Sequence, residues 1–148
     1  MRGAEIGISP DPSGSGLVGL PIWLWTAVTP LTWGPITATA SVPGLSVTAR
    51  GQATEIRWDM GDGRSVTCEN PGTPYNKATH GASASTTCGY PGYSVPSRTQ
   101  PDGRYTVVAT TTWHIEWWVV GGGATGAETV TRESSTSIRI DELQVVTG

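Results

Sequence analysis

Apolar and polar residues alternate with a period of two from Arg104 to Val120, the longest regular pattern in the chain. This period is typical of a β-strand with one buried face, and its length predicts one long strand or a strand bent by a bulge. Trp113 and Trp117 fall on the apolar face, whereas Trp118 falls on the opposite, threonine-rich face. We expect that second face to meet solvent, because threonine is polar and β-branched.

Shorter segments with the same period predict further strands. Residues 36–42 and 45–49 alternate and are separated by Pro43-Gly44, the residue pair of a type II turn. Other strands are expected at residues 54–58, 64–68, 128–132 and 137–146. No segment combines a period of 3.6 residues with helix formers and caps. The pattern therefore predicts an all-β sandwich.

The strand at residues 54–58 runs into the sequence Trp58-Asp59-Met60-Gly61-Asp62-Gly63. Glycine adopts positive φ at little cost, and an Asp side chain accepts hydrogen bonds from backbone N–H groups two residues on. Gly61-Asp62-Gly63 therefore predicts a tight turn, and Asp59 is expected to help close it. Residues 64–68 then return as the second strand of a hairpin.

The segment from Trp58 to Gly63 resembles the signature of PKD (polycystic-kidney-disease-type) domains, with Met60 where that family usually has an aromatic residue. The cysteine pair after the motif and the Tyr-x-Val-x-Ala strand at residues 105–109 are similar to PKD-type domains of secreted actinobacterial proteins. The resemblance covers about residues 36–120. It implies an immunoglobulin-like β-sandwich used for extracellular binding or spacing, and it implies no catalysis.

Length and composition predict one PKD-like domain at residues 21–148 after a flexible linker at residues 1–20. A chain of 148 residues is long enough to bury a core. Residues 9–16 are rich in Ser, Pro and Gly, the composition of an extended or disordered linker. The apolar stretch at residues 17–28 is too short to span a membrane, so we expect no direct membrane insertion of this segment.

The net charge limits the classes of partner, and the number of cysteines indicates the cellular compartment. The formal net charge is −3 and charged residues make up 14% of the chain, so no basic field is present for nucleic acid or for a membrane surface. Cys68 and Cys88 are the only cysteines. In a small β-rich chain they predict one disulfide and an oxidising compartment, either extracellular or at the cell surface. Two buried free thiols are the alternative.

Residues 70–101 contain few aliphatic residues and form the longest expected loop, which carries Tyr75, Tyr90 and Tyr93. Long loops are usually functional or flexible, and exposed aromatic rings form flat platforms for sugars. These tyrosines and Trp118 are therefore the candidate ligand contacts. The alternatives are that Tyr90 and Tyr93 dock onto the sheets and that Trp118 packs against residues 21–33.

Catalytic and metal-binding patterns are sparse. His80 in the loop and His114 on the long strand lack a matched nucleophile, so we predict no enzyme and no catalytic residue. Asp59 and Asp62 are oxygen ligands near a turn, which makes calcium an alternative to plain turn chemistry. Turn chemistry is the preferred interpretation, and no metal or other cofactor is predicted.

These observations predict a non-catalytic protein-interaction or spacer module of a secreted or surface-assembled protein. Exposed strand edges and the threonine-rich face are the expected contact surface, with a protein partner or self-assembly favoured over polysaccharide. One alternative is a carbohydrate-binding module for cell-envelope polysaccharide, led by Trp118 and the loop tyrosines. Another is a subunit of an extracellular filament or coat, assembled through residues 1–20 or an exposed edge.

Overall fold

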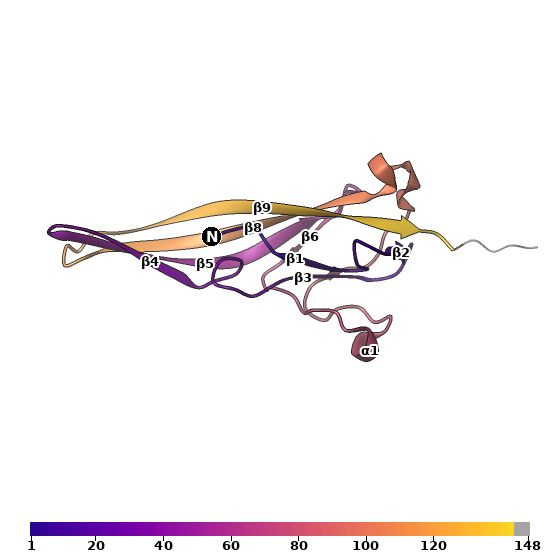
Figure 1. The fold of residues 1–148 in the computed structure, drawn as a ribbon, viewed down its shortest axis with the longest axis horizontal. Coiled ribbons are helices and arrows are strands. Elements are labelled where there is room, and N and C mark those ends of the chain that lie inside the picture. Colours follow the sequence, from indigo (N-terminus) through magenta and orange to yellow (C-terminus); the bar gives the residue numbers. More distant parts are fainter. Residues whose placement is uncertain (144–148) are drawn as a thin grey trace, which may run out of the picture.

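The computed structural model describes residues 1–143 and shows two β-sheets in a sandwich-like all-β fold (Figure 1). The larger sheet has the strand order β2-β9-β8-β5-β4, and β6 also pairs with β5. Its strands are β2 (Ser15–Leu17), β4 (Ile36–Val42), β5 (Leu45–Asp59), β6 (Ser65–Cys68), β8 (Tyr105–Val120) and β9 (Thr125–Asp141). The smaller sheet has the order β1-β3-β7 and contains β1 (Ile6–Ser9), β3 (Ile22–Thr26) and β7 (Gly89–Tyr90). The connections include the short helix α1 (Lys77–His80) and two 3-10 turns, Ser97–Thr99 and Pro101–Gly103.

The core lies between the two sheets and follows the alternation seen in the sequence. Along β8, residues from Tyr105 to Ile115 on the apolar face are buried, while most residues on the threonine face are partly or fully exposed. Trp58 of β5 is 1% exposed and packs in this core with Leu24 of the smaller sheet. Burial of such large apolar side chains is the main favourable contribution to folding.

Two strands, β5 and β9, are longer than the sequence pattern predicts. The separate strands expected at residues 45–49 and 54–58 form one strand, β5, with a register irregularity between Ala53 and Glu55. The long antiparallel partner β8 keeps β5 continuous, because its backbone pairs with β5 on both sides of this point. The two strands expected at residues 128–132 and 137–146 likewise form the single strand β9, and residues 144–146 lie outside the described part.

The prediction of a flexible linker at residues 1–20 is wrong, because this segment belongs to the sandwich. β1 pairs antiparallel with β3, and β2 pairs parallel with the end of β9. Ala4 and Ile8 are each 5% exposed and join the core. The Ser-, Pro- and Gly-rich composition of residues 9–16 describes only the connection around β2, whereas the apolar residues before it supply a strand.

One end of the larger sheet extends beyond the smaller sheet as an arm (Figure 1). We define the arm as residues 36–50 and 116–127, which form the β4–β5 and β8–β9 hairpin ends. Gly44 has a φ of 78° in the turn after Pro43, as a type II turn requires. The arm begins near Gly51, where a Cβ atom would come within 2.7 Å of the Met1 sulfur, so the N-terminus covers the sheet up to this position.

Candidate functional site

The smaller sheet covers one face of the larger sheet in the body of the molecule. On the arm the same face is apolar, and no other element of residues 1–143 covers it in this way. Strand register places the side chains of this face in rows across β4, β5 and β8. They are Ile36, Ala38, Ala40, Val42, Leu45, Val47, Ala49, Trp117 and Val119. Val42 is 61% exposed and Leu45 is 49% exposed, which is unusual for large apolar side chains that share one face.

This face continues the buried face of the body. Trp113 and Ile115 of β8 are 0% and 9% exposed, and Trp117 and Val119 follow them on the same side of the strand. The indole of Trp117 lies over Gly126 of β9, where a Cβ atom would come within 2.3 Å of the ring. The arm is therefore built like the inner layer of a sandwich whose second layer ends before it.

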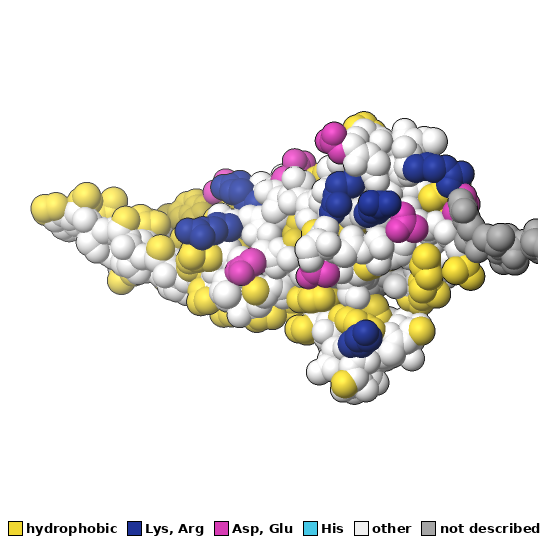
Figure 2. Space-filling model, turned by 45° about the vertical axis from the view of Figure 1, so that its right-hand side comes forward, with side chains coloured by type: hydrophobic (Ala, Val, Ile, Leu, Met, Phe, Trp, Pro, Cys, Tyr) yellow, Lys and Arg dark blue, Asp and Glu magenta, His cyan; other side chains and the backbone are white. Residues whose placement is uncertain are grey.

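Apart from Arg50 and Glu116 at its base, the arm also lacks charge. Residues 36–49 and 117–127 contain no Asp, Glu, Lys, Arg or His. Figure 2 shows hydrophobic side chains along the tapering arm, with the charged groups gathered over the body. A surface without charges costs little to desolvate when a partner covers it, because no ionised group must leave water.

Trp118 lies on the opposite face of the arm, as its place in the alternation predicts. Thr48 and Thr125 are its register neighbours, and the residue is 36% exposed. The surface hollow beside Trp118 is lined by residues 116–118 and 125–127, none of which belongs to the segment 21–33 that the alternative named. Its partial exposure keeps Trp118 available for contact.

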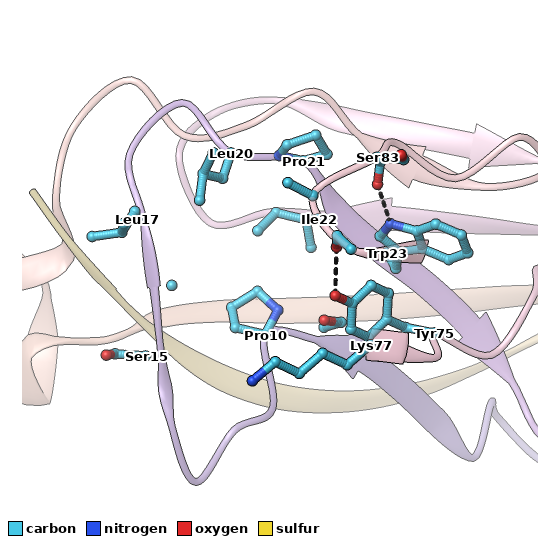
Figure 3. Close-up of a pocket in the computed structure, with 14 residues that line it drawn as sticks. Pro10, Ser15, Leu17, Leu20, Pro21, Ile22, Trp23, Tyr75, Lys77 and Ser83 are labelled. Atoms are coloured by element: carbon cyan, nitrogen blue, oxygen red, sulfur yellow. Dashed lines mark hydrogen bonds between the residues drawn. The ribbon is translucent and has the colours of Figure 1, made fainter. Parts of the chain in front are cut away.

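A second surface is an apolar cleft of about 420 Å³ beside β3 and α1 (Figure 3). Trp23 and Tyr75 line it, and their rings meet edge to face with centroids 5.3 Å apart. The Trp23 indole N–H donates to the Ser83 carbonyl oxygen at 2.8 Å, which fixes the ring under the loop. Lys77, the only lysine of the chain, stands at the rim of the cleft near Pro10. Of the four predicted ligand contacts, Tyr75 is the one that lines this cleft.

Tyr90 and Tyr93 are placed differently from the prediction that they contact a ligand. They are 4% and 1% exposed, so their rings belong to the core, in line with the alternative that they dock onto the sheets. Burial and a hydrogen bond from the Tyr90 hydroxyl to the Asp62 carboxylate raise the pKa of Tyr90 to about 12. Burial also raises the pKa of Tyr93, whose ring stacks on Tyr105 at 4.2 Å.

The motif from Trp58 to Gly63 forms the predicted turn and anchors these tyrosines. One Asp62 carboxylate oxygen accepts the Arg64 N–H at 3.0 Å, the contact expected of an Asp-Gly turn. The other oxygen accepts the Tyr90 hydroxyl, which the sequence did not indicate. Asp59 instead lies 3.5 Å from Arg57 in an exposed ion pair. Within residues 1–143, no group of three or more His, Cys, Asp or Glu side chains is arranged to hold a metal ion.

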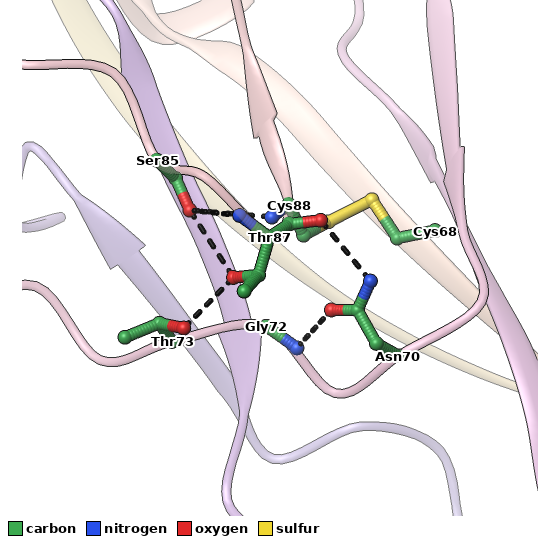
Figure 4. Close-up of a disulfide and its surroundings, with 7 residues drawn as sticks. All are labelled: Cys68, Asn70, Gly72, Thr73, Ser85, Thr87 and Cys88. Carbon is green, nitrogen blue, oxygen red and sulfur yellow. Dashed lines mark hydrogen bonds between the residues drawn. A yellow bond between two sulfur atoms is a disulfide. The ribbon is translucent and has the colours of Figure 1, made fainter.

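The predicted disulfide between Cys68 and Cys88 is present, with Cα atoms 5.8 Å apart (Figure 4). Polar side chains brace the loop around it. The Asn70 amide donates to the Thr87 carbonyl oxygen at 3.1 Å, and the Thr73 and Thr87 hydroxyls are 2.8 Å apart. The disulfide thus ties the end of β6 to β7, and with it the larger sheet to the smaller one.

Both histidines contact neighbouring side chains or backbone groups of the fold. The ring of His80 packs on Trp23 with centroids 4.3 Å apart, and its Nδ1 accepts the Asn76 N–H at 2.9 Å. His114 Nε2 lies 3.5 Å from a Glu116 carboxylate oxygen on the exposed face of β8. Neither histidine is hydrogen-bonded to a serine, threonine or cysteine side chain among the described residues.

The fold and these surfaces define a disulfide-tied all-β sandwich with an arm that has an apolar face and carries charge only at its base. None of the helices in residues 1–143 has the length and apolar character needed to cross a membrane. The chain matches no family model, no curated protein and no solved structure.

Proposed function

We propose that this chain is a non-catalytic protein-interaction module of a secreted or surface-assembled protein, and that the arm is its contact surface. The observation that carries the proposal is the apolar face of the arm, which lies open where the same face of the body is covered. Contiguous exposed apolar surface is typical of a site that another macromolecule covers. Rigid strands present it, so binding orders little additional chain.

The extracellular setting and the relation to PKD domains are parts of this proposal. The Cys68–Cys88 disulfide supports an oxidising compartment. The two-sheet architecture and the motif at the β5–β6 turn support the resemblance to PKD-type domains. In this proposal the body spaces and orients the arm, and it carries out no chemistry.

The test compares two charges on the same strand. Leu45→Asp places a carboxylate on the apolar face, and Thr48→Asp places one on the opposite face of the arm. The oxidised protein and both variants are immobilised and offered the secreted proteins of the source organism. We expect one protein, confirmed afterwards in purified form, to bind the wild type and Thr48→Asp and to bind Leu45→Asp at least tenfold more weakly. Equal binding to both variants would remove the apolar face from the proposal.

A second candidate function is carbohydrate binding, which the cleft beside Tyr75 favours. An apolar floor with aromatic rings suits the apolar face of a sugar ring. Retention of the wild type on envelope polysaccharide, with loss in Tyr75→Ala, would support this alternative. Retention of polysaccharide that survives in Tyr75→Ala and is lost in Trp118→Ala would place the sugar on the arm instead.

A further inference from the structure

The outer edge of β4 is an open strand edge. Val42 and Leu45 close a two-residue turn, so they form a hydrogen-bonded pair, and such pairs alternate along the ladder. The backbone groups of the even-numbered residues 36–42 therefore face β5. The N–H and C=O groups of Thr37, Thr39 and Ser41 point outward, and no strand of residues 1–143 pairs with this edge.

This edge lacks the usual protection against pairing. Proteins guard open edges with charged residues, proline or bulges. Within residues 36–42 there is no charge and no proline, and the register with β5 is unbroken. The outer edge of β9, in contrast, carries Glu128, Arg132 and Glu133. Of the two long outer strands of the larger sheet, β4 and β9, β4 is therefore the one with the unguarded edge.

The sequence of β4 has the same chemical order in both directions about Thr39. It runs Ile36-Thr37-Ala38-Thr39-Ala40-Ser41-Val42. When two copies pair antiparallel with Thr39 opposite Thr39, alanine meets alanine, hydroxyl residues meet hydroxyl residues, and isoleucine meets valine. This register satisfies every outward N–H and C=O group of the strand and brings no like charges together.

We propose that β4 pairs with β4 of a second copy of this chain across a two-fold axis at Thr39. The inference rests on the proposed function of the arm and names one of its partners. An interface of this kind is isologous and closes as a dimer. The two larger sheets become continuous, and because the axis is perpendicular to the sheet, both apolar arm faces lie on the same side.

Existing contacts on the polar face fit this pairing. The Thr39 and Thr48 hydroxyl oxygens are 3.0 Å apart, and the Ser41 hydroxyl donates to Ser46 at 3.2 Å. Pairing at Thr39 extends this row of hydroxyl groups across the axis into the second copy. The two copies would therefore meet through hydroxyl contacts of the kind that already join β4 and β5.

A cysteine pair tests the register. In a hydrogen-bonded antiparallel pair the Cα atoms are about 5.5 Å apart, within the range of a disulfide. Thr39→Cys is therefore expected to give disulfide-linked dimers under mild oxidation, since the chain has no free cysteine to compete. Thr48→Cys is the matched control, because it lies one strand inward and its Cα is roughly 15 Å from its copy in the dimer. Equal dimer yields from the two variants would overturn the register.

Sedimentation over a wide concentration range tests the association itself. We expect reversible dimers of the wild type and of Thr48→Lys, and at least tenfold weaker dimerisation of Thr39→Lys, which places two ammonium groups at the axis. Circular dichroism verifies that each variant is folded. A wild type that stays monomeric at all concentrations would overturn the proposed dimer. The proposed function would still stand in that case if Leu45→Asp weakens capture of the protein partner at least tenfold. Loss of the difference between Leu45→Asp and Thr48→Asp would instead overturn the proposed function.

Discussion

The hydroxyl of Tyr93 donates a hydrogen bond of 2.8 Å to the main-chain oxygen of Met60, which anchors the loop after the disulfide inside the Trp58–Gly63 motif. Tyr90 binds the same turn through the Asp62 carboxylate. The motif therefore forms a hairpin turn and also holds the connection between the two sheets. Removal of this hydrogen bond is therefore expected to lower the free energy of unfolding and to leave binding by the arm unchanged.

Removal of the Tyr93 hydroxyl tests this anchor. Tyr93→Phe leaves the Met60 carbonyl oxygen buried without its donor, which should lower the free energy of unfolding by about 1–3 kcal/mol. Tyr75→Phe is the control, because its hydroxyl donates to the Gly81 carbonyl oxygen in an exposed loop, where a change within about 0.5 kcal/mol is expected. Urea unfolding followed by fluorescence gives both values. Equal losses for the two variants would contradict the role of the buried contact.

High pH should destabilise the fold through the same tyrosines. The pKa of Tyr90 is about 12 in the folded state and near its ordinary value of 10.0 in the unfolded chain. The folded state therefore retains the proton more strongly, and this contribution to stability is complete below pH 10 and is lost as pH rises toward 12. Urea unfolding between pH 9 and pH 12 should show a fall that is shallower in Tyr90→Phe. Parallel curves for the two proteins would contradict this assignment.

Loss of the disulfide should weaken the domain without changing the arm. Cys68 and Cys88 are separated by 20 residues, and closing a loop of this size contributes about 3 kcal/mol on the chain-entropy model. The Cys68→Ser, Cys88→Ser double variant is expected to lose about this much free energy of unfolding. Adding reductant to the double variant is the control and should change nothing. An unaltered stability of the double variant would show that the loop holds itself.

Two glycines of the motif provide a matched pair. Gly61 has a φ of 82°, and a Cβ atom there would come within 2.5 Å of the Thr106 carbonyl oxygen. Gly63 has a φ of 86°, and nothing lies within 4 Å of its Cβ position. Gly63→Ala should cost only the left-handed backbone penalty of about 1–2 kcal/mol, whereas Gly61→Ala should cost clearly more. Thermal unfolding ranks the two, and the reverse order would contradict this turn geometry.

Trp118→Ala separates the two faces of the arm. The Trp118 side chain lies on the polar face and is partly exposed, so its removal should lower the free energy of unfolding by about 0.5–3 kcal/mol and leave capture of the protein partner intact. Trp117→Ala is the comparison, because it uncovers Gly126 on the apolar face and should reduce capture. Binding measured with the purified partner gives both effects. Loss of capture in Trp118→Ala alone would move the contact surface to the polar face.

Local sequence pattern determined much of the secondary structure of this protein. A period of two needs only the pleat of a strand to place side chains, so β8 and the two faces of its side chains follow from the sequence. The turn at Gly61-Asp62-Gly63 follows from backbone freedom and a local side-chain contact. The disulfide follows from there being two cysteines in a small β-rich chain.

Tertiary packing decided which apolar surfaces are covered. The period of the hydrophobic pattern alone does not predict this. The first 20 residues, which include a stretch of linker composition, are ordered because Ile8 is buried in the core. Tyr90 and Tyr93 leave the surface because the Trp58–Gly63 turn supplies partners for their hydroxyls. Trp113 and Trp117 occupy equivalent places in the alternation, yet one is buried in the body and the other lies on the open arm. The difference arises because Arg2, whose carbonyl oxygen accepts the Trp113 indole N–H, and Gly34 lie against Trp113. These contacts join segments far apart in the chain.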